Sequence, residues 1–158
     1  MNKINISRLP KIIIGADHRG FKLKEKIKLF LKAKGFAVED KGTCSEEPCD
    51  YPKIAFKVGL GVVRAKNSRG ILICKTGIGD SIAANKVKGV RAALCYNMKA
   101  ARLSRQHNDA NVLVLGSDFV REKLAKEIIE TWLKIEFEGG RHLRRINQIK
   151  RFEEKRCL

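Results

Sequence analysis

The chain has 158 residues, of which 44% are hydrophobic, so it can bury the core of one domain without disulfide support. Its five cysteines are odd in number and form no CxxC pair, and no apolar run has the length of a membrane span or a signal peptide, which predicts a cytoplasmic protein with reduced thiols. A net charge of +17 favours anionic ligands. We interpret the many lysines as solvated helix surface, and we expect neither nucleic acid nor a membrane as a partner.

Short apolar runs alternate along the chain with segments of helical spacing. Three of the runs are nearly continuous, as is typical of strands covered on both faces. This alternation predicts an α/β domain with a parallel sheet and helices on both sides. In chain order we expect strand 11–15, a helix through Leu23 and Leu31 that stops at Gly35, a weaker strand 36–40, helix 52–66, strand 70–74, helix 79–86, strand 90–95, helix 97–106, strand 111–116, helix 120–135 and a helix from 141 onward.

Polar and glycine-rich segments follow the predicted strands, at the edge where parallel sheets bind ligands. Cys74 ends one strand, and the turn after it offers backbone N–H groups and the positive end of a helix to an anion. That helix end can lower a thiol pKa, so Cys74 is a candidate base or nucleophile, although its position alone favours a buried structural cysteine. Asp80 is either an ordinary acid of a first helical turn or a second candidate base. Neither the Cys-x5-Arg pattern nor a nucleotide-binding motif is present.

Two further candidates lie elsewhere in the predicted fold. His107 precedes the strand 111–116, so it belongs at the opposite edge of the sheet from Cys74, and a capping or surface histidine is the simple alternative. If both residues act on one substrate, a second chain must supply His107, which predicts a homodimer with shared sites. Arg141 and Arg145 lie one helical turn apart and suit a phosphate, unless they belong to a solvated basic tail.

Six strings stand out in their order along the chain: Gly15-Ala-Asp-His-Arg-Gly20, Asp50-Tyr-Pro52, Gly70-Ile-Leu-Ile-Cys-Lys-Thr-Gly-Ile-Gly79, Ile82-Ala-Ala-Asn-Lys86, Ser104-Arg-Gln-His-Asn-Asp109 and Glu138-Gly-Gly-Arg-His142. Together they resemble the ribose-5-phosphate isomerase B family, which includes galactose-6-phosphate isomerase subunits. The resemblance covers residues 11–150 and implies a single-domain, Rossmann-like three-layer α/β/α sandwich with a five-stranded parallel sheet. Residues 1–10 are then an N-terminal extension and 151–158 a C-terminal tail.

The resemblance also implies an activity: interconversion of D-ribose 5-phosphate and D-ribulose 5-phosphate through a cis-enediolate, in the non-oxidative pentose phosphate pathway. The family needs no metal or organic cofactor and forms homodimers, and whether dimers pair into tetramers stays open. Such a reaction requires an acid–base group and oriented hydrogen-bond donors for the enediolate. Pocket size is not encoded in any motif, so allose 6-phosphate or galactose 6-phosphate is the alternative substrate.

Carried over residue by residue, the family assigns the base to Cys74, stabilisation of the oxyanion to Thr76, and ring opening to His107 of a partner chain. Asp17 is expected to hold the sugar beside His107. The remaining residues are expected to bind substrate: Asp50 and Tyr51 in the sugar pocket, the backbone around Gly77 and Gly79, Asp80, Asn108 at the reacting oxygens, and His18, Arg141 and Arg145 at the phosphate.

This chain departs from the family pattern at three positions. Lys75 replaces a common glycine, where it can either favour the thiolate or point to solvent. Asp80 stands where members that lack the cysteine have a glutamate base, so the base is Cys74 or, as the alternative, Asp80. Asp118 replaces a usual arginine in the turn after the last strand, and Arg121 is a candidate substitute.

Overall fold

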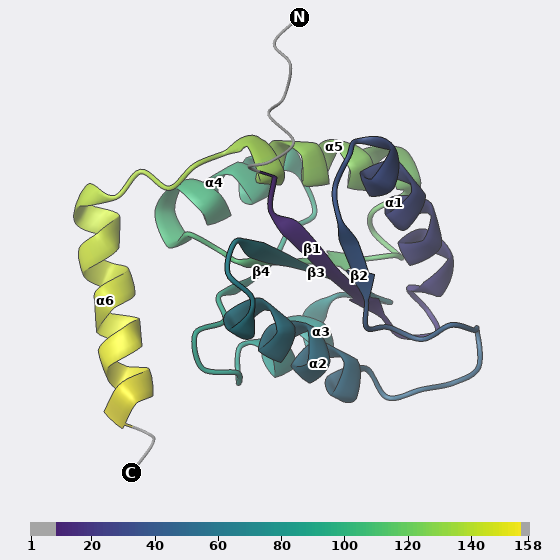
Figure 1. Cartoon of the computed structure of the whole chain (residues 1–158), viewed down its shortest axis with the longest axis horizontal. Helices are drawn as coiled ribbons and strands as arrows, with labels where there is room; N and C mark the ends of the chain where they lie inside the picture. Colours follow the sequence, from purple (N-terminus) through teal and green to yellow (C-terminus); the bar gives the residue numbers. More distant parts are fainter. Residues whose placement is uncertain (1–8, 156–158) are drawn as a thin grey trace, which may run out of the picture.

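The computed structural model describes residues 9–155, which form a parallel sheet between two layers of helices (Figure 1). The five strands have the order β2-β1-β3-β5-β4, and all neighbouring pairs are parallel. The predicted α/β fold with a five-stranded parallel sheet is therefore confirmed. The strands are β1 Lys11–Ala16, β2 Val38–Asp40, β3 Ser68–Cys74, β4 Ala92–Leu94 and β5 Val112–Gly116.

The helices follow the predicted order, with ends that differ from the predicted ones by a few residues. The N-terminal extension lies largely outside the described residues, and the last helix runs on past residue 150 to Lys155. No helix in the described part of the chain is long and apolar enough to cross a membrane. The helices are α1 Phe21–Ala33, α2 Tyr51–Arg64, α3 Ile78–Ala84, α4 Met98–Asn108, α5 Glu122–Lys134 and α6 Gly140–Lys155.

The central strands are apolar on both faces because each face is covered by helices. In β1, Ile12 and Ile14 pack with α1, α4 and α5, whereas Ile13 between them packs with α2 and α3. This alternation puts a continuous run of isoleucines in the interior, with exposed fractions of at most 1%. Burial on both faces explains why the runs read as continuous in the sequence.

The helix α6 stands apart from both helical layers, beside the β4 edge of the sheet (Figure 1). Its described contacts with the domain run mainly to α4, and His142 and Ile146 are its buried residues. Leu143, Ile149 and Phe152 remain exposed, with Phe152 60% exposed. One side of α6 therefore packs on the domain, and an apolar part of it does not.

Candidate active site

The strand order places a crevice at the carboxyl ends of β1 and β3. The chain leaves β1 toward one edge of the sheet and leaves β3 toward the other, and ligands of open α/β sheets bind at such a reversal. Asp17 directly follows β1, and Cys74 is the last residue of β3. These two candidates therefore lie together at the carboxyl ends of the two central strands.

The turn after β3 wraps backbone N–H groups around the Cys74 sulfur. Gly77 has a φ of +80°, a left-handed conformation that glycine adopts readily, and its N–H donates to Sγ at 3.1 Å. Thr76 Oγ1 accepts a bond from the N–H of Ile78 at 3.3 Å, at the start of α3. The Cys74 side chain is 5% exposed. The N–H of Gly77 thus supports the sulfur itself.

The net shift of the Cys74 pKa is opposite to the one that the helix end alone would give. Burial, followed by the negative charges of Asp80 and Asp17, raises the pKa of the Cys74 thiol to about 12, although backbone N–H groups of Gly77 and Asp80 act in the opposite sense. The N–H groups at the start of the seven-residue helix α3 favour the thiolate, but less strongly than burial and the two carboxyl groups oppose it. The resting thiol therefore carries its proton.

Asp80 occupies the first turn of α3 and is 1% exposed. Neither of its carboxyl oxygens accepts a hydrogen bond of ordinary geometry within the described residues. Burial raises the pKa of Asp80 to about 7, the Cys74 thiol lowers it and the charge of Asp17 raises it. This carboxyl group changes its charge near neutral pH, as a general base requires.

Asp17 is 6% exposed, and one of its oxygens shapes the loop that follows β1. Asp17 Oδ1 accepts bonds from the N–H groups of Arg19 at 3.0 Å and Gly20 at 2.9 Å. A Cβ on Gly20 would lie 2.1 Å from the carbonyl oxygen of Ile73, so this loop rests directly on β3. The loop and the Cys74 turn are therefore held together by backbone packing.

The predicted sugar-pocket residues lie next to this turn. The ring of Tyr51 covers Gly79, where a Cβ would fall 2.5 Å from Tyr51 Cζ. His18 Nδ1 accepts a bond from the N–H of Cys49 at 3.2 Å. His18 and Asp50 also line an open cleft of about 620 Å³. The start of α1, the loop before α2 and the start of α3 thus meet in one region.

His107 and Asn108 lie at the other end of the sheet, as predicted. They end α4 just before β5, and the far end of β5, Gly116, is the residue that pairs with Cys74. The His107 ring stacks on the ring of His142, with centroids 4.2 Å apart and planes inclined by 8°. Glu138 Oε2 lies 3.9 Å from His107 Nε2 and 3.8 Å from His142 Nε2.

The sequence pattern did not predict the part that His142 and Glu138 play beside His107. Burial, His107 and Arg141 lower the pKa of His142, which favours a neutral ring against its neighbour. The available signal was the string Glu138 to His142, which places the acid and the imidazole four residues apart. Within the described residues, these three side chains also bring potential metal ligands within 4.8 Å of one another.

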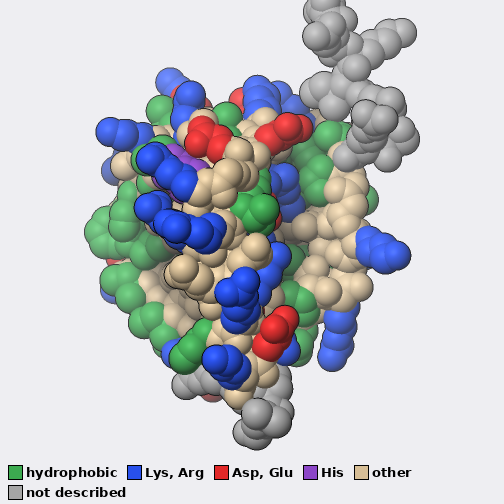
Figure 2. Space-filling view, turned by 90° about the vertical axis from the view of Figure 1, so that its left-hand side faces the viewer, with side chains coloured by type: hydrophobic (Ala, Val, Ile, Leu, Met, Phe, Trp, Pro, Cys, Tyr) green, Lys and Arg blue, Asp and Glu red, His purple; other side chains and the backbone are tan. Residues whose placement is uncertain are grey.

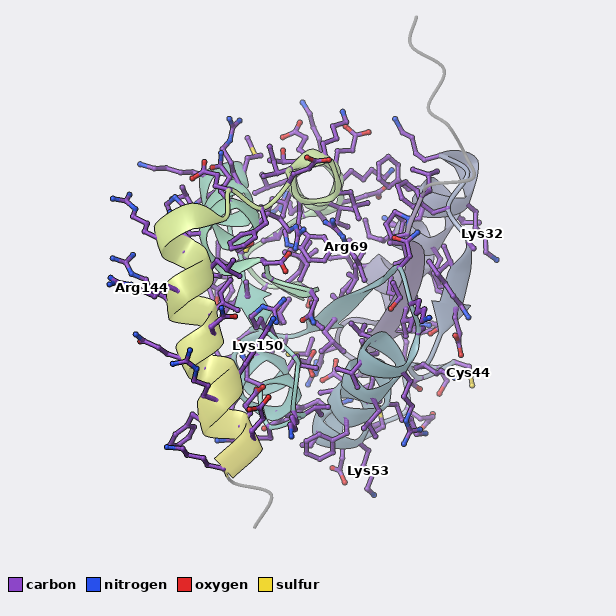
Figure 3. The ribbon with its side chains drawn as sticks, turned by 60° about the vertical axis from the view of Figure 1, so that its left-hand side comes forward. Lys32, Cys44, Lys53, Arg69, Arg144 and Lys150 are labelled. Atoms are coloured by element: carbon purple, nitrogen blue, oxygen red, sulfur yellow. The ribbon has the colours of Figure 1, made fainter. Side chains whose placement is uncertain are left out.

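Arg141 and Arg145 are exposed on α6 and are not brought near Cys74 within one chain. Figure 2 shows Lys and Arg side chains gathered on the face of the molecule that bears α6. In Figure 3, Arg144 of the same helix points outward on the opposite side of the domain from Cys44, in the loop beside the 620 Å³ cleft. The candidate residues thus form two groups, one at each end of the domain.

The departures at Lys75 and Asp118 are neighbours in space. The N–H of Asp118 donates to the carbonyl of Lys75 at 3.0 Å, and Lys75 Nζ lies 4.0 Å from Asp118 Oδ2. Lys75 is 59% exposed and therefore points to solvent, one of its two expected orientations. Arg121 lines a separate cleft with Arg19 and Lys22.

An α/β fold that brings Asp17, Cys74 and Asp80 to the carboxyl ends of β1 and β3 is typical of an enzyme that acts on a small substrate. The sequence profile of the ribose/galactose isomerase family matches residues 12–149. The chain therefore belongs to the ribose/galactose isomerase family, as the resemblance of its motifs indicates.

Three relatives illustrate the match. Ribose-5-phosphate isomerase B of Escherichia coli is 49% identical over 94% of this chain and 99% of the relative. The structure of the Clostridium thermocellum ribose-5-phosphate isomerase B superposes with a TM-score of 0.90 at 52% identity, covering 92% of this chain and 98% of that one. The Mycoplasma genitalium enzyme with bound ribulose-5-phosphate has a TM-score of 0.88 at 48% identity, over 91% and 96% of the two chains.

Proposed function

We propose that this chain interconverts D-ribose 5-phosphate and D-ribulose 5-phosphate, and that it acts in the cytoplasm. The observation that carries the activity is the full-length similarity to ribose-5-phosphate isomerases B, one of them with ribulose-5-phosphate bound. Cys74 at the end of β3 and Asp80 in the first turn of α3, whose pKa is raised to about 7, support it. The cysteines at positions 44, 49, 74 and 95 are free thiols, which agrees with a reducing compartment.

The reaction moves a proton between C2 and C1 of the open-chain sugar. The phosphate binds His18, Arg141 and Arg145, and His107 assists ring opening. The Cys74 sulfur accepts the proton from one carbon and returns it to the other, which gives a cis-enediolate between the two steps. Thr76 and the backbone around Gly79 stabilise the oxyanion, since donors preorganised at a developing charge lower the barrier.

The remaining site residues orient the sugar. Tyr51 packs against Gly79, in the turn that follows Cys74, and contacts the sugar from there. Asp50 lies at the rim of the adjoining cleft, with a side chain that is 77% exposed. Asp17 and Asn108 contact the hydroxyl and reacting oxygens of the substrate. The polar contacts of the sugar therefore come from both ends of the domain.

This distribution calls for a homodimer with shared sites. Cys74 and His107 lie at opposite ends of the sheet, so one chain cannot apply both to one substrate molecule. In the dimer, the His107 end of one protomer faces the Cys74 end of its partner. The exposed apolar side chains of α6 and the adjacent arginines supply an interface and a phosphate contact.

The first experiment measures conversion of ribose 5-phosphate by the purified protein and by Cys74→Ala. We expect turnover by the unaltered chain and a loss of at least about a hundredfold in Cys74→Ala, because general acid–base groups contribute this much or more. Cys44→Ala, at an exposed cysteine, is the matched control and should retain full turnover. Near-normal turnover by Cys74→Ala would move the base role to Asp80.

Sharing of the site is tested by mixing two inactive variants. Cys74→Ala and His107→Ala protomers should regain activity when combined, because one of the two sites in a mixed dimer has both groups intact. Exchange of subunits is verified independently by native mass spectrometry of tagged protomers. Activity that stays at the level of the separate variants, despite exchange, would contradict the shared site.

The choice between pentose and hexose substrates requires rates measured side by side. We expect a higher kcat/KM for ribose 5-phosphate than for allose 6-phosphate or galactose 6-phosphate, as the names of the similar enzymes suggest. The reverse order of rates would assign the protein to the hexose phosphate members of its family.

A further inference from the structure

The buried carboxyl group of Asp80 has no partner among nitrogen and oxygen donors. Both oxygens are inaccessible to solvent and accept no hydrogen bond within the described residues. Buried polar groups in folded proteins are almost always hydrogen-bonded, and an unpaired carboxylate is costly to bury. An exception at the edge of a candidate active site points to a group that exchanges a proton there.

The Cys74 thiol is the side chain that lowers the pKa of this carboxyl group. Backbone N–H groups favour a negative charge on the sulfur, whereas the surroundings of the Asp80 carboxyl group favour its protonated form. Sγ receives the N–H of Gly77 at 3.1 Å, and the backbone N–H of Asp80 also favours the thiolate. The carboxyl oxygens have no such donor and are free to accept the proton of the thiol.

The solvent exposure of Cys74 and Asp80 indicates which of the two residues lies nearer to the substrate. Cys74 is 5% exposed, whereas the Asp80 side chain is 1% exposed and its oxygens have no accessible surface. Cys74 is therefore the more accessible of the two residues, and the carboxyl oxygens of Asp80 lie beneath the surface. Asp80 acts on the reaction through Cys74, which makes it a positioning residue.

We propose, on the basis of the isomerase function proposed above, that Asp80 is the proton acceptor for the Cys74 thiol. The S–H bond breaks, its proton passes to the Asp80 carboxylate, and the thiolate keeps the electron pair. The thiolate then removes the carbon proton, which gives a thiol and the enediolate. The thiol protonates the other carbon, and the resulting thiolate recovers the proton of the Asp80 carboxylic acid, so the pair returns to its starting state.

The charges around the pair are consistent with this relay. The pKa of Cys74, raised to about 12, leaves very little thiolate at neutral pH if the thiol acts alone. The pKa of Asp80, raised to about 7, makes its carboxylate a proton acceptor at the same pH. Transfer of the proton to Asp80 also removes the negative charge that raises the pKa of the thiol.

The test is Asp80→Asn, which preserves size and removes the charge. Loss of the Asp80 charge lowers the thiol pKa, so a thiolate that acts alone becomes more abundant and turnover at neutral pH should rise. The relay predicts the opposite: kcat falls by about a hundredfold with little change in KM, because the proton acceptor is missing. The rise of kcat with pH through about 7 should also disappear.

Alkylation of Cys74 by iodoacetamide reports the thiol without any turnover. In Asp80→Asn we expect alkylation of the Cys74 peptide to be roughly tenfold faster at fixed pH, which corresponds to about one unit of thiol pKa. Asp118→Asn removes an exposed carboxylate at the same sheet edge and should change neither the alkylation rate nor the pH inflection. Faster alkylation together with slower turnover identifies the relay.

The alternative outcomes are distinct. Unchanged or higher kcat in Asp80→Asn overturns the relay, and so does a lower kcat that keeps the inflection near pH 7, since that pattern belongs to a structural role. If Asp80→Asn does not fold, Asp80→Glu replaces it: a retained inflection with reduced kcat supports the relay, and a lost inflection overturns it. An unaltered enzyme without turnover of ribose 5-phosphate refutes the proposed function, whereas the alkylation result stands independently.

Discussion

Asp80→Asn should also change how stability depends on pH. The folded-state pKa of about 7 lies above the value of 3.8 for an unperturbed Asp, so the folded chain binds the proton more tightly than the unfolded chain. For such a group, the free energy of unfolding is highest below the unfolded pKa, where both states carry the proton. It falls as the pH rises from the unfolded pKa to the folded pKa. Asp80 should therefore destabilise the fold progressively between about pH 4 and pH 7.

The size of this effect follows from the pKa shift. At about 1.36 kcal/mol per unit, the buried carboxylate costs roughly 4 kcal/mol at pH 8 and roughly 1.5 kcal/mol at pH 5. An Asn at this position loses about 1–3 kcal/mol at every pH, because its amide is also buried without a partner. Asp80→Asn should thus gain about 2.5 kcal/mol relative to the parent chain between pH 5 and pH 8.

Urea denaturation of both proteins at several pH values between these limits measures the difference. The subtraction cancels other titrating groups, because both chains contain them. Asp118→Asn, at an exposed carboxylate, should give a curve parallel to that of the parent chain. Parallel curves for the parent and Asp80→Asn would refute the reasoning, since they would mean that the Asp80 carboxyl group has an ordinary pKa.

Three further substitutions test the loops, the second end of the domain and the substrate contacts. Gly20→Ala should destabilise the fold by more than about 2 kcal/mol in urea, because its Cβ meets the Ile73 carbonyl oxygen at 2.1 Å. Arg105→Lys should lower the free energy of unfolding by about 2–4 kcal/mol, since one ammonium cannot replace the bonds of the buried guanidinium to Asp109 and the backbone. An unchanged midpoint of urea denaturation would contradict this. Asp118→Asn should lower the KM for ribose 5-phosphate severalfold at constant kcat, because it removes a negative charge from the sheet end that binds an anionic substrate; an unchanged KM would mean that the Asp118 charge does not act on the bound substrate.

The sequence was sufficient for the sheet and for the separation of the site into two parts. Continuous apolar runs predict strands covered on both faces, and the structure has five parallel strands at those positions. The separation of His107 from Cys74 followed from chain order alone. His107 precedes β5 and Cys74 ends β3, and because these neighbouring strands are parallel, the two residues lie at opposite ends of the sheet. Both conclusions depend only on the apolar pattern of each segment and on the order and direction of the strands along the chain, which can be read from the sequence.

The electrostatics of the thiol could not be predicted in the same way. From the sequence, Cys74 lies before a helix, whose N-terminus favours an anion. The structure adds the burial of the sulfur, which is the largest cause of its raised pKa, then the charge of Asp80 and, as a smaller contribution, that of Asp17 in the loop after β1. A pKa depends on what packs around a group in three dimensions. The contact of His107 with His142 has the same origin, since it joins two helices that are distant in the sequence.

Lys75 and Asp118 show how two departures from a family pattern can constitute one change. Considered separately, the lysine adds a cation beside the thiol, and the aspartate removes a contact to phosphate. The N–H of Ser117 donates to the Cys74 carbonyl at 2.9 Å, and this bond, with that from Asp118 to Lys75, fixes the two turns side by side. The Lys75 ammonium then lies near the Asp118 carboxylate, at an exposed position where an ion pair contributes at most about 1 kcal/mol. Because this cation is directed to Asp118 and solvent, it does not offset the burial and the carboxylate charge that raise the pKa of the Cys74 thiol.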